Sequence, residues 1–331
     1  MAIDERTNVI PAVYHMNLLQ AIVIGLLQGV SELFPISSLG HTVLVPSWIG
    51  GTWATLVREE ASAESPYLAF VVGLHLATAV VLLGFYFREW VRLVVGFFRS
   101  LTHRKVVTDE ERLAWLIIVA TIPVGALGLI FEHQFRVLFA KPLAAALFLM
   151  VNGVILFSGE IHRRRHQRAI ADGSAETDPD PSPTAPARFR DDHIVTIDAE
   201  AERQLSRIGL VSAAIIGASQ ALALLAGISR EGVAMVGGLF RGLSNQNAMR
   251  FSFLLSTPVI LAAGALKIPD LVGPLGAGIR PEIIAGSLAA VVSSLFAVFF
   301  LARYFKTRTL MPFAIYSLAF GLASAIRFGF Y

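Results

Sequence analysis

Six apolar runs, each close to the ~20 residues that a helix needs to cross the hydrocarbon core of a bilayer, constrain this chain more than any other feature. They span residues 68–87, 113–131, 142–159, 251–268, 282–302 and 311–328. The composition agrees, since 55% of the 331 residues are hydrophobic and 15% are charged, whereas a soluble domain has roughly 25% charged residues. We therefore predict an all-α, polytopic membrane protein with six spans.

Two further apolar stretches, residues 17–45 and 208–240, are interrupted by helix-breaking residues. The first contains Pro35 among several glycines, and the second contains the pair Gly237-Gly238. Non-helical backbone at membrane depth is tolerated only where protein buries it or where it lines a wet cavity. Both stretches are therefore predicted to be re-entrant hairpins made of two half-helices. The alternative is a chain of eight to ten ordinary spans.

Each half of the chain then has one hairpin followed by three spans. Because three is odd, the second half enters the membrane in the opposite sense to the first, which is an inverted repeat. We expect the first repeat at residues 1–159, the second at residues 208–331, and a linker at residues 160–207.

Lysine and arginine are distributed unevenly between the two sides that this topology defines. Segments 88–112, 160–207 and 303–310 share one side and hold 17 of them, whereas the other side holds 5. Because positive loops stay inside, we expect the first group in the cytoplasm, and both termini and the active site toward the outside of the plasma membrane. The net charge of +3 is then explained by orientation, and no nucleic-acid partner is expected.

The linker at residues 160–207 differs in composition from the rest of the chain. It carries an arginine cluster at residues 163–165 and the sequence DPDPSPTAP at residues 178–186. Such a segment cannot bury enough apolar surface to offset its ordering entropy. We predict a disordered cytoplasmic linker whose arginines contact anionic membrane lipids.

Polar residues gather at the break in the first hairpin. Gln28 and Glu32 share a helix face, and Ser37 and Ser38 lie within one turn of His41 if a helix follows Pro35. Free backbone N–H groups at such a break suit a phosphate. Alternatively, the serines only cap the second half-helix and His41 is an interfacial histidine.

The second hairpin adds a fixed cation, because Ser229, Arg230 and Glu231 stand between Gly227 and Gly232. A charge at bilayer depth is costly and is kept mainly where it meets partners, water or substrate. The guanidinium fork of arginine suits a bidentate grip on a phosphoryl group. Charge at membrane depth therefore selects four candidates for chemistry: Glu32, His41, Arg230 and Glu231.

Residues 25–41, GLLQGVSELFPISSLGH, resemble the first signature of the undecaprenyl pyrophosphate phosphatase family of the bacitracin-resistance type. Residues 219–232, SQALALLAGISREG, followed by FSFLLSTP at 251–258, are similar to its second signature. The resemblance covers nearly all of the chain outside the linker. It implies an inverted-repeat membrane enzyme that removes the terminal phosphate from a C55 polyprenyl diphosphate on the outer face, and it implies a homodimer.

The resemblance also implies roles for individual residues. The catalytic core would be Glu32, Ser38, His41 and Arg230, and the substrate-binding residues would be Gln28, Ser37, Gln220, Gly227 and Ser229. This chain departs from the family pattern at Ala226, Glu231 and Ala234, and it has His75 where glutamine is expected. Either Glu231 supplies a further carboxylate, for metal or acid–base work, or the chain is a paralog with an altered substrate or little activity.

Two forms of phosphoryl transfer fit these residues. Arg230 and the N–H groups would hold the diphosphate, and either Ser38, activated by His41, or a water would attack phosphorus, with His41 or Glu32 managing the proton. We expect a divalent cation, Mg²⁺ or Ca²⁺, on Glu32 and Glu231. His75 would be a ligand of the cation, a donor to one of its ligands, or a packed histidine bonded to backbone.

Two rival functions follow from the same features. Broken helices in an inverted repeat are also the construction of transporters, so a flippase for the same lipid is the alternative from another class. The acid-phosphatase-like lipid phosphatases need a histidine six residues after their arginine, and this chain has Val236 at that position. We therefore set the second rival aside.

Overall fold

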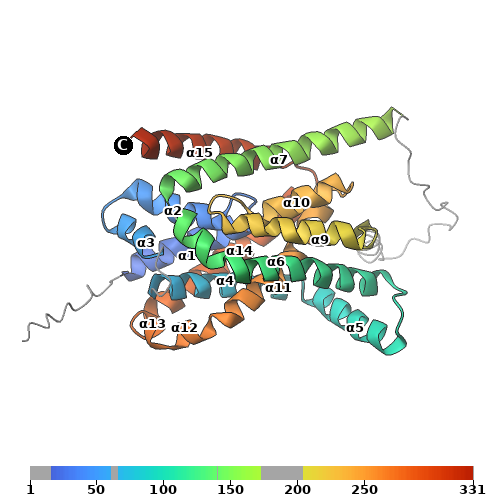
Figure 1. Ribbon diagram of the computed structural model, residues 1–331, viewed down its shortest axis with the longest axis horizontal. Helices are drawn as coiled ribbons and strands as arrows, with labels where there is room; N and C mark the ends of the chain where they lie inside the picture. The colour runs from blue at the N-terminus through green and yellow to red at the C-terminus, as the bar shows by residue number, and fades with distance from the viewer. Residues whose placement is uncertain (1–15, 61–65, 140, 173–203, 331) are drawn as a thin grey trace, which may run out of the picture.

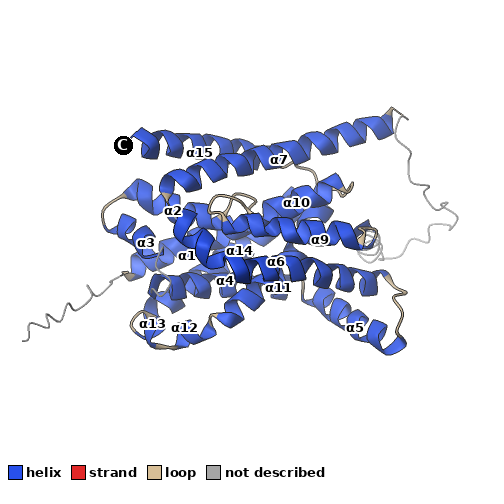
Figure 2. Cartoon of the chain, viewed as in Figure 1, coloured by secondary structure: helices blue, strands red, loops and turns tan. Residues whose placement is uncertain are grey.

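A computed structural model of the chain describes residues 16–60, 66–139, 141–172 and 204–330. Within these ranges every regular element is a helix and there is no strand (Figure 2). Five helices are long and apolar enough to cross a membrane, and there are six if the bent pair of α4 and α5 counts as one span. The prediction of an all-α, multi-pass membrane protein is therefore confirmed.

Each interrupted apolar stretch forms a pair of helices separated by a break. The first stretch gives α1 (Leu18–Leu33) and α2 (Ser38–Ile49), and the second gives α9 (Leu210–Ser219), the 3-10 helix η1 (Gln220–Leu224) and α10 (Arg230–Phe240). The side chain of Asn17 caps α1 by accepting from the Gln20 N–H at 2.8 Å. The helix ends at Leu33 because the residue before Pro35 disfavours the α conformation.

The six predicted spans coincide with six long helices. These are α4 (Pro66–Phe85), α6 (Asp109–Phe139), α7 (Pro142–Ala171), α11 (Asn245–Leu266), α14 (Arg280–Tyr304) and α15 (Met311–Phe330). Two of them, α11 and α4, end two residues before the predicted boundary. Helix ends fray, so a difference of one or two residues at a boundary has no structural significance.

Segments that the sequence places in loops also contain helices. The predicted loop at residues 88–112 holds α5 (Phe87–His103), which is bent by 81° from α4. Its apolar side chains recur at helical spacing and are exposed on one face, at Phe87, Val91, Val94, Phe98 and Leu101. This amphipathic pattern is too charged for a span and is typical of a helix at a membrane interface. Three short helices, α3 (Thr52–Glu60), α12 (Ile268–Val272) and α13 (Pro274–Ala277), lie in other predicted loops.

The predicted linker begins later than residue 160, because α7 continues to Ala171. Glu160 stabilises this extension by accepting from Arg163 at 2.6 Å and from Arg164 at 3.0 Å, at the i+3 and i+4 positions. Residues 173–203 lie outside the described residues, so their disorder stays a prediction.

Helices from the two halves of the chain pack against one another reciprocally (Figure 1). The hairpin helix α1 packs on α14, the hairpin helix α9 packs on α6, and α7 packs on α15. Contact between α1 and α14 is close, because a Cβ on Gly25 would lie 2.2 Å from the Gly286 carbonyl oxygen. Each hairpin thus rests on the middle span of the other half, as two inverted repeats would require; the repeat itself stays a prediction.

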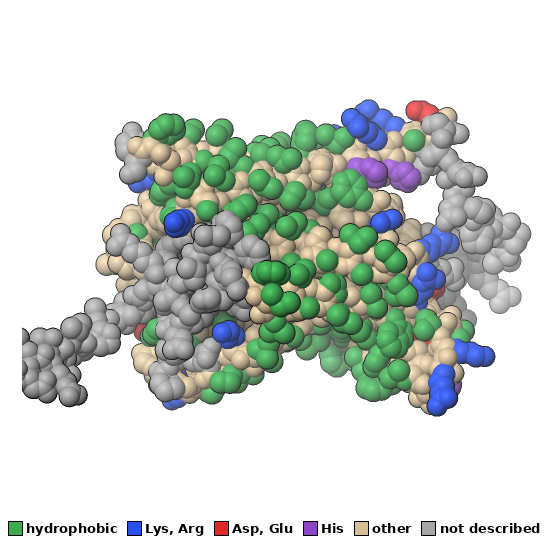
Figure 3. Space-filling view, viewed as in Figure 1, with side chains coloured by type: hydrophobic (Ala, Val, Ile, Leu, Met, Phe, Trp, Pro, Cys, Tyr) green, Lys and Arg blue, Asp and Glu red, His purple; other side chains and the backbone are tan. Residues whose placement is uncertain are grey.

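The surface of the described chain has an apolar middle and a basic end. Figure 3 shows hydrophobic side chains across the body, and blue Lys and Arg side chains mostly at the end that carries α5 and the far end of α7. On α14, Ile284, Leu288, Val292 and Phe296 are 60–66% exposed at helical spacing. Such a continuous apolar face would be unstable in water and suits a lipid environment.

Candidate active site

The breaks of the two hairpins meet at one buried amide. Asn152 on α7 is fully buried, and its Nδ2 donates to the Pro35 carbonyl oxygen at 3.0 Å. Its Oδ1 accepts from the backbone N–H of Ser229 at 3.0 Å. A third bond joins Nδ2 to the Ser317 hydroxyl of α15 at 3.3 Å. Asn152 therefore satisfies one backbone group from each break and ties the two breaks together.

Ser37 makes a second link between the breaks. Its hydroxyl oxygen accepts from the Gly40 N–H at 3.2 Å, which caps α2, and from the Gly227 N–H at 3.1 Å, which belongs to the other hairpin. Ser37 has a φ of 71°, a left-handed conformation that is unusual for a residue with a side chain. This turn presents the next residue, Ser38, at the start of α2.

The two breaks approach closely enough to require glycine at the contact. A Cβ on Gly40 would lie 2.9 Å from the Gly227 Cα, and a Cβ on Gly227 would lie 2.4 Å from the Ala145 carbonyl oxygen. Gly227 also has a φ of 116°, which L side chains rarely adopt. We therefore assign Gly227 to the geometry of the second break.

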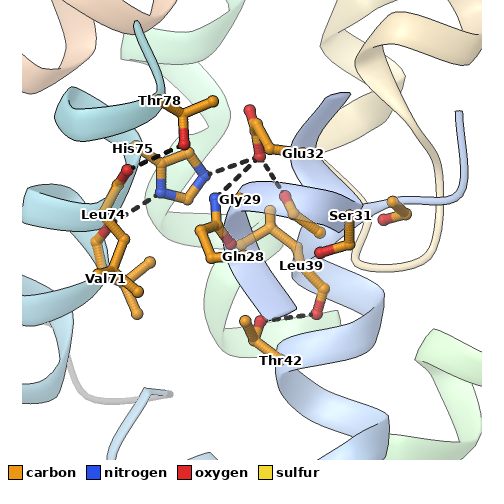
Figure 4. A network of polar contacts seen from close by, with 12 residues as sticks. Gln28, Gly29, Ser31, Glu32, Leu39, Thr42, Val71, Leu74, His75 and Thr78 are labelled. Atoms are coloured by element: carbon orange, nitrogen blue, oxygen red, sulfur yellow. Dashed lines mark hydrogen bonds and ion pairs between the residues drawn. The ribbon is translucent and has the colours of Figure 1, made fainter. Parts of the chain in front are cut away.

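The carboxylate of Glu32 is the centre of a buried polar cluster (Figure 4). Its Oε2 accepts from Gln28 Nε2 at 3.0 Å and from the hydroxyl of Ser38. His75, on α4, places its Nε2 3.3 Å from the same oxygen. Glu32 is 2% exposed, so these three contacts replace the water that an ionised carboxylate needs.

The contacts of His75 show which of its ring nitrogens carries a hydrogen. Its Nδ1 lies 2.9 Å from the Val71 carbonyl oxygen, which can only accept, so Nδ1 carries a hydrogen. The Nε2 atom then either donates to the Glu32 carboxylate from a doubly protonated ring or accepts from a protonated Glu32. His75 thus stands beside Glu32 and is at the same time bonded to backbone.

Arg230 begins α10, directly after the capping residue Ser229, whose hydroxyl accepts from the Gly232 N–H at 3.0 Å. The Arg230 guanidinium acts electrostatically on Glu32, His75 and Glu231. Within the described chain it forms no hydrogen bond or ion pair, and its Nη1 atom is buried without a partner. A guanidinium with a buried, unpaired nitrogen is a position for an anion.

Glu231 lies in the same region, with an Oε1 that is buried and has no partner among the described residues. The hydroxyl of Ser252 on α11 donates to the Glu231 carbonyl oxygen at 3.1 Å, which fixes the start of α10. Glu231 and Glu32 are near enough to influence one another electrostatically. No group of three His, Cys, Asp or Glu in the described chain has the geometry of a complete metal site.

His41 is not paired with Ser38, in contrast to the predicted hydroxyl and imidazole couple. Its Nδ1 lies 2.7 Å from the Ser37 carbonyl oxygen, and its Nε2 lies 2.8 Å from the hydroxyl oxygen of Tyr316 on α15. Both ring nitrogens are therefore engaged away from Glu32. The hydroxyl of Ser38 donates to Glu32 instead, so the neighbouring base is a carboxylate.

Of the remaining predicted residues, Gln220 lies in η1 and is buried, and neither of its amide atoms has a partner among the described residues. It therefore makes no hydrogen bond to the Glu32 cluster.

Sequence reasoning missed Asn152 and Tyr316. Both belong to ordinary apolar spans, and their contacts reach 117 and 275 positions along the chain, so no local pattern could have identified them.

The site combines the Ser38 hydroxyl, which donates to the Glu32 carboxylate, with the Nη1 of Arg230, which is unpaired among the described residues. The starts of α2 and α10 lie beside these groups. Helix starts present free N–H groups and attract anions. A hydroxyl that donates to a carboxylate is placed to lose its proton on attacking an electrophile. The site can therefore hold a phosphoryl group and supply an oxygen nucleophile to it.

Comparison with known proteins agrees with this chemistry. The family model described as bacitracin resistance protein BacA matches residues 21–323. An undecaprenyl-diphosphatase of Mycolicibacterium paratuberculosis is 52% identical over 94% of this chain and 97% of its own length. Undecaprenyl-diphosphatase 2 of Frankia alni is 51% identical over 95% of this chain and 99% of its own length. The chain belongs to the BacA family.

Proposed function

We propose that this chain is an integral membrane phosphatase that hydrolyses undecaprenyl diphosphate to the monophosphate and inorganic phosphate. The observation that carries the proposal is the buried Ser38–Glu32 pair beside an Arg230 whose Nη1 has no partner among the described residues. The two relatives named undecaprenyl-diphosphatase, at 52% and 51% identity, support this substrate.

The mechanism that the contacts favour begins with an attack by Ser38. Its oxygen bonds to the terminal phosphorus while its proton passes to Glu32, and the bond to the bridging oxygen breaks to release the prenyl monophosphate. Water then cleaves the phosphoserine, which releases phosphate and restores the hydroxyl. Arg230 and the free N–H groups at the starts of α2 and α10 hold the charge of the transition state.

We also propose that a divalent cation binds together with the substrate. Glu231 offers a buried, unpartnered oxygen, and Glu32 offers the second carboxylate. Two carboxylates with substrate phosphates are the usual binding set for Mg²⁺, and Ca²⁺ takes similar oxygen ligands. When bound, the ion would neutralise charge on the diphosphate. We therefore expect cation binding to depend on the diphosphate.

Phosphate release by the purified protein in detergent tests the function. Wild type should release phosphate from C55 diphosphate with Mg²⁺ or Ca²⁺, and Ser38→Ala and Arg230→Ala should each lower kcat by about 10² or more. Ser158→Ala is a matched serine control, because Ser158 donates only to the Ile155 carbonyl oxygen of its own helix. An unchanged rate in Arg230→Ala would overturn the site. No release by wild type with either ion would favour the flippase or an altered paralog.

We further propose that the site opens toward the outside of the plasma membrane, with the segment 160–207 in the cytoplasm. The proposal rests on the uneven distribution of lysine and arginine and on the positive-inside rule. The chain has no cysteine, so single cysteines report topology directly. In whole cells an impermeant maleimide should label Gly51→Cys, and it should label Lys105→Cys only after permeabilisation. The reverse pattern would refute the orientation.

The homodimer implied by the resemblance and the bacitracin phenotype implied by the family description are part of the same proposal. Light scattering of the detergent complex, corrected for bound detergent, should give twice the chain mass of 35.8 kDa. Expression of the chain should raise the bacitracin tolerance of a sensitive host, and Arg230→Ala should not. A monomeric mass would contradict only the dimer.

A further inference from the structure

The basic nitrogen of His41 is held by a tyrosine from the other half of the chain. Because the Ser37 carbonyl oxygen can only accept, the hydrogen of the neutral ring is on Nδ1, and the bond of 2.7 Å runs from His41 to Ser37. The Nε2 atom is then an acceptor, and the Tyr316 hydroxyl donates to it at 2.8 Å. The two bonds together fix both ends of the imidazole.

Aromatic packing reinforces this hold. The His41 and Tyr316 rings stack at 5.7 Å between centroids and 11° between planes, and the Phe320 ring lies 5.6 Å from His41. Tyr316 and Phe320 are four positions apart on α15, so they present one face to α2. His41 is 2% exposed, whereas Tyr316 is 42% exposed, so the phenol forms the outer edge of the contact.

The contact is continuous with the turn that carries Ser38. His41 donates to the carbonyl oxygen of Ser37, the residue with the left-handed φ of 71°. The Ser37 hydroxyl accepts from Gly227 of the second break. A left-handed conformation with a side chain is strained and persists only when its surroundings fix it. His41 is one of the groups that fix it, and Tyr316 holds His41.

We propose that Tyr316 is a positioning residue of this enzyme. It orients His41, and through the bond from His41 to Ser37 it stabilises the turn that presents Ser38 to the phosphoryl group. The proposal rests on the proposed function, because it concerns the rate of phosphate release. It predicts an effect on the chemical step and little effect on substrate binding, since the phenol contacts neither Glu32 nor Arg230 among the described residues.

The test removes one oxygen and keeps the stacked ring. Tyr316→Phe should lower kcat by about three- to tenfold, the range that corresponds to one neutral hydrogen bond, with KM changed less than twofold. Tyr304→Phe is the matched control, because the Tyr304 hydroxyl donates to the Thr309 carbonyl oxygen and does not touch His41. Its kcat should equal that of wild type.

A double-mutant cycle separates positioning from general stability. In single-turnover reactions with excess enzyme, Tyr316→Phe should slow phosphate release in wild type and change the rate less than twofold in a His41→Ala background. An equal loss in both backgrounds, or a wild-type kcat in Tyr316→Phe, would overturn the proposal. If His41→Ala shows no turnover, the kcat and KM of Tyr316→Phe decide alone. An inactive wild type would instead refute the proposed function.

Discussion

Asn152 should determine whether the two hairpin breaks stay together. Its side chain satisfies the Pro35 carbonyl and the Ser229 N–H, each at 3.0 Å, and it is fully buried. The substitution Asn152→Leu keeps a similar volume but leaves both backbone groups without a partner. A buried polar group that loses its partner costs about 1–3 kcal/mol, so the two together should cost roughly 2–6 kcal/mol.

Two measurements on detergent-purified protein check this expectation. Thermal unfolding should show a clearly lower midpoint for Asn152→Leu, and kcat per folded molecule should fall at least tenfold, because Arg230 follows Ser229 directly and loses its fixed position. Thr257→Val is the control: Thr257 is 1% exposed, but its hydroxyl donates only to the Phe253 carbonyl oxygen of its own helix. If Asn152→Leu behaves like Thr257→Val in both assays, the proposed bridge is wrong.

Three further tests address other parts of the site, and two of them include a matched comparison substitution. His75→Leu should lower kcat about tenfold because it removes the polar partner of Glu32 on α4. His75→Gln, whose amide can still donate to that carboxylate, should stay within about threefold. Equal rates for the two variants would contradict a role for the contact. Gly227→Ala should prevent recovery of folded protein, because its Cβ would lie 2.4 Å from the Ala145 carbonyl oxygen. Gly50 also has a positive φ, but a Cβ there would have nothing within 4 Å. Gly50→Ala should therefore fold, with only a small decrease in the midpoint of thermal unfolding. Glu231→Gln should raise the Mg²⁺ concentration for half-maximal phosphate release about tenfold, and an unchanged titration would remove Glu231 from the cation site.

The helices could be predicted because their signals are local. Apolar length identified the six long helices, and Pro35 located the first break. The pair Gly237-Gly238 lies inside α10, and the second break falls at Gly227 instead. The amphipathic helix α5 was missed because its segment was assessed by charge, although its apolar residues recur at helical spacing. A search for amphipathic segments between spans would have found it.

The candidate site could be predicted only in part, because its residue types are local and its pairing is not. Sequence spacing brought Gln28 and Glu32 to one helix face, and the structure joins them at 3.0 Å. The same reasoning placed Ser38 beside His41, since residues three apart on a helix are neighbours. However, Ser38 and His41 have partners that local spacing does not consider, namely Glu32 across the break and Tyr316 on α15.

The unpartnered atoms of the site indicate what the fold is built to receive. Buried polar atoms are nearly always hydrogen-bonded, yet Gln28 Oε1, Arg230 Nη1, Glu231 Oε1 and the Ser256 hydroxyl have no partner among the described residues. They include a cationic donor, Arg230, and an anionic acceptor, Glu231, and no single protein side chain would satisfy both. A phosphoryl group with a bound cation would, because its oxygens accept from arginine while the metal accepts carboxylate ligands. Binding of the substrate would therefore offset the cost of burying these atoms without partners.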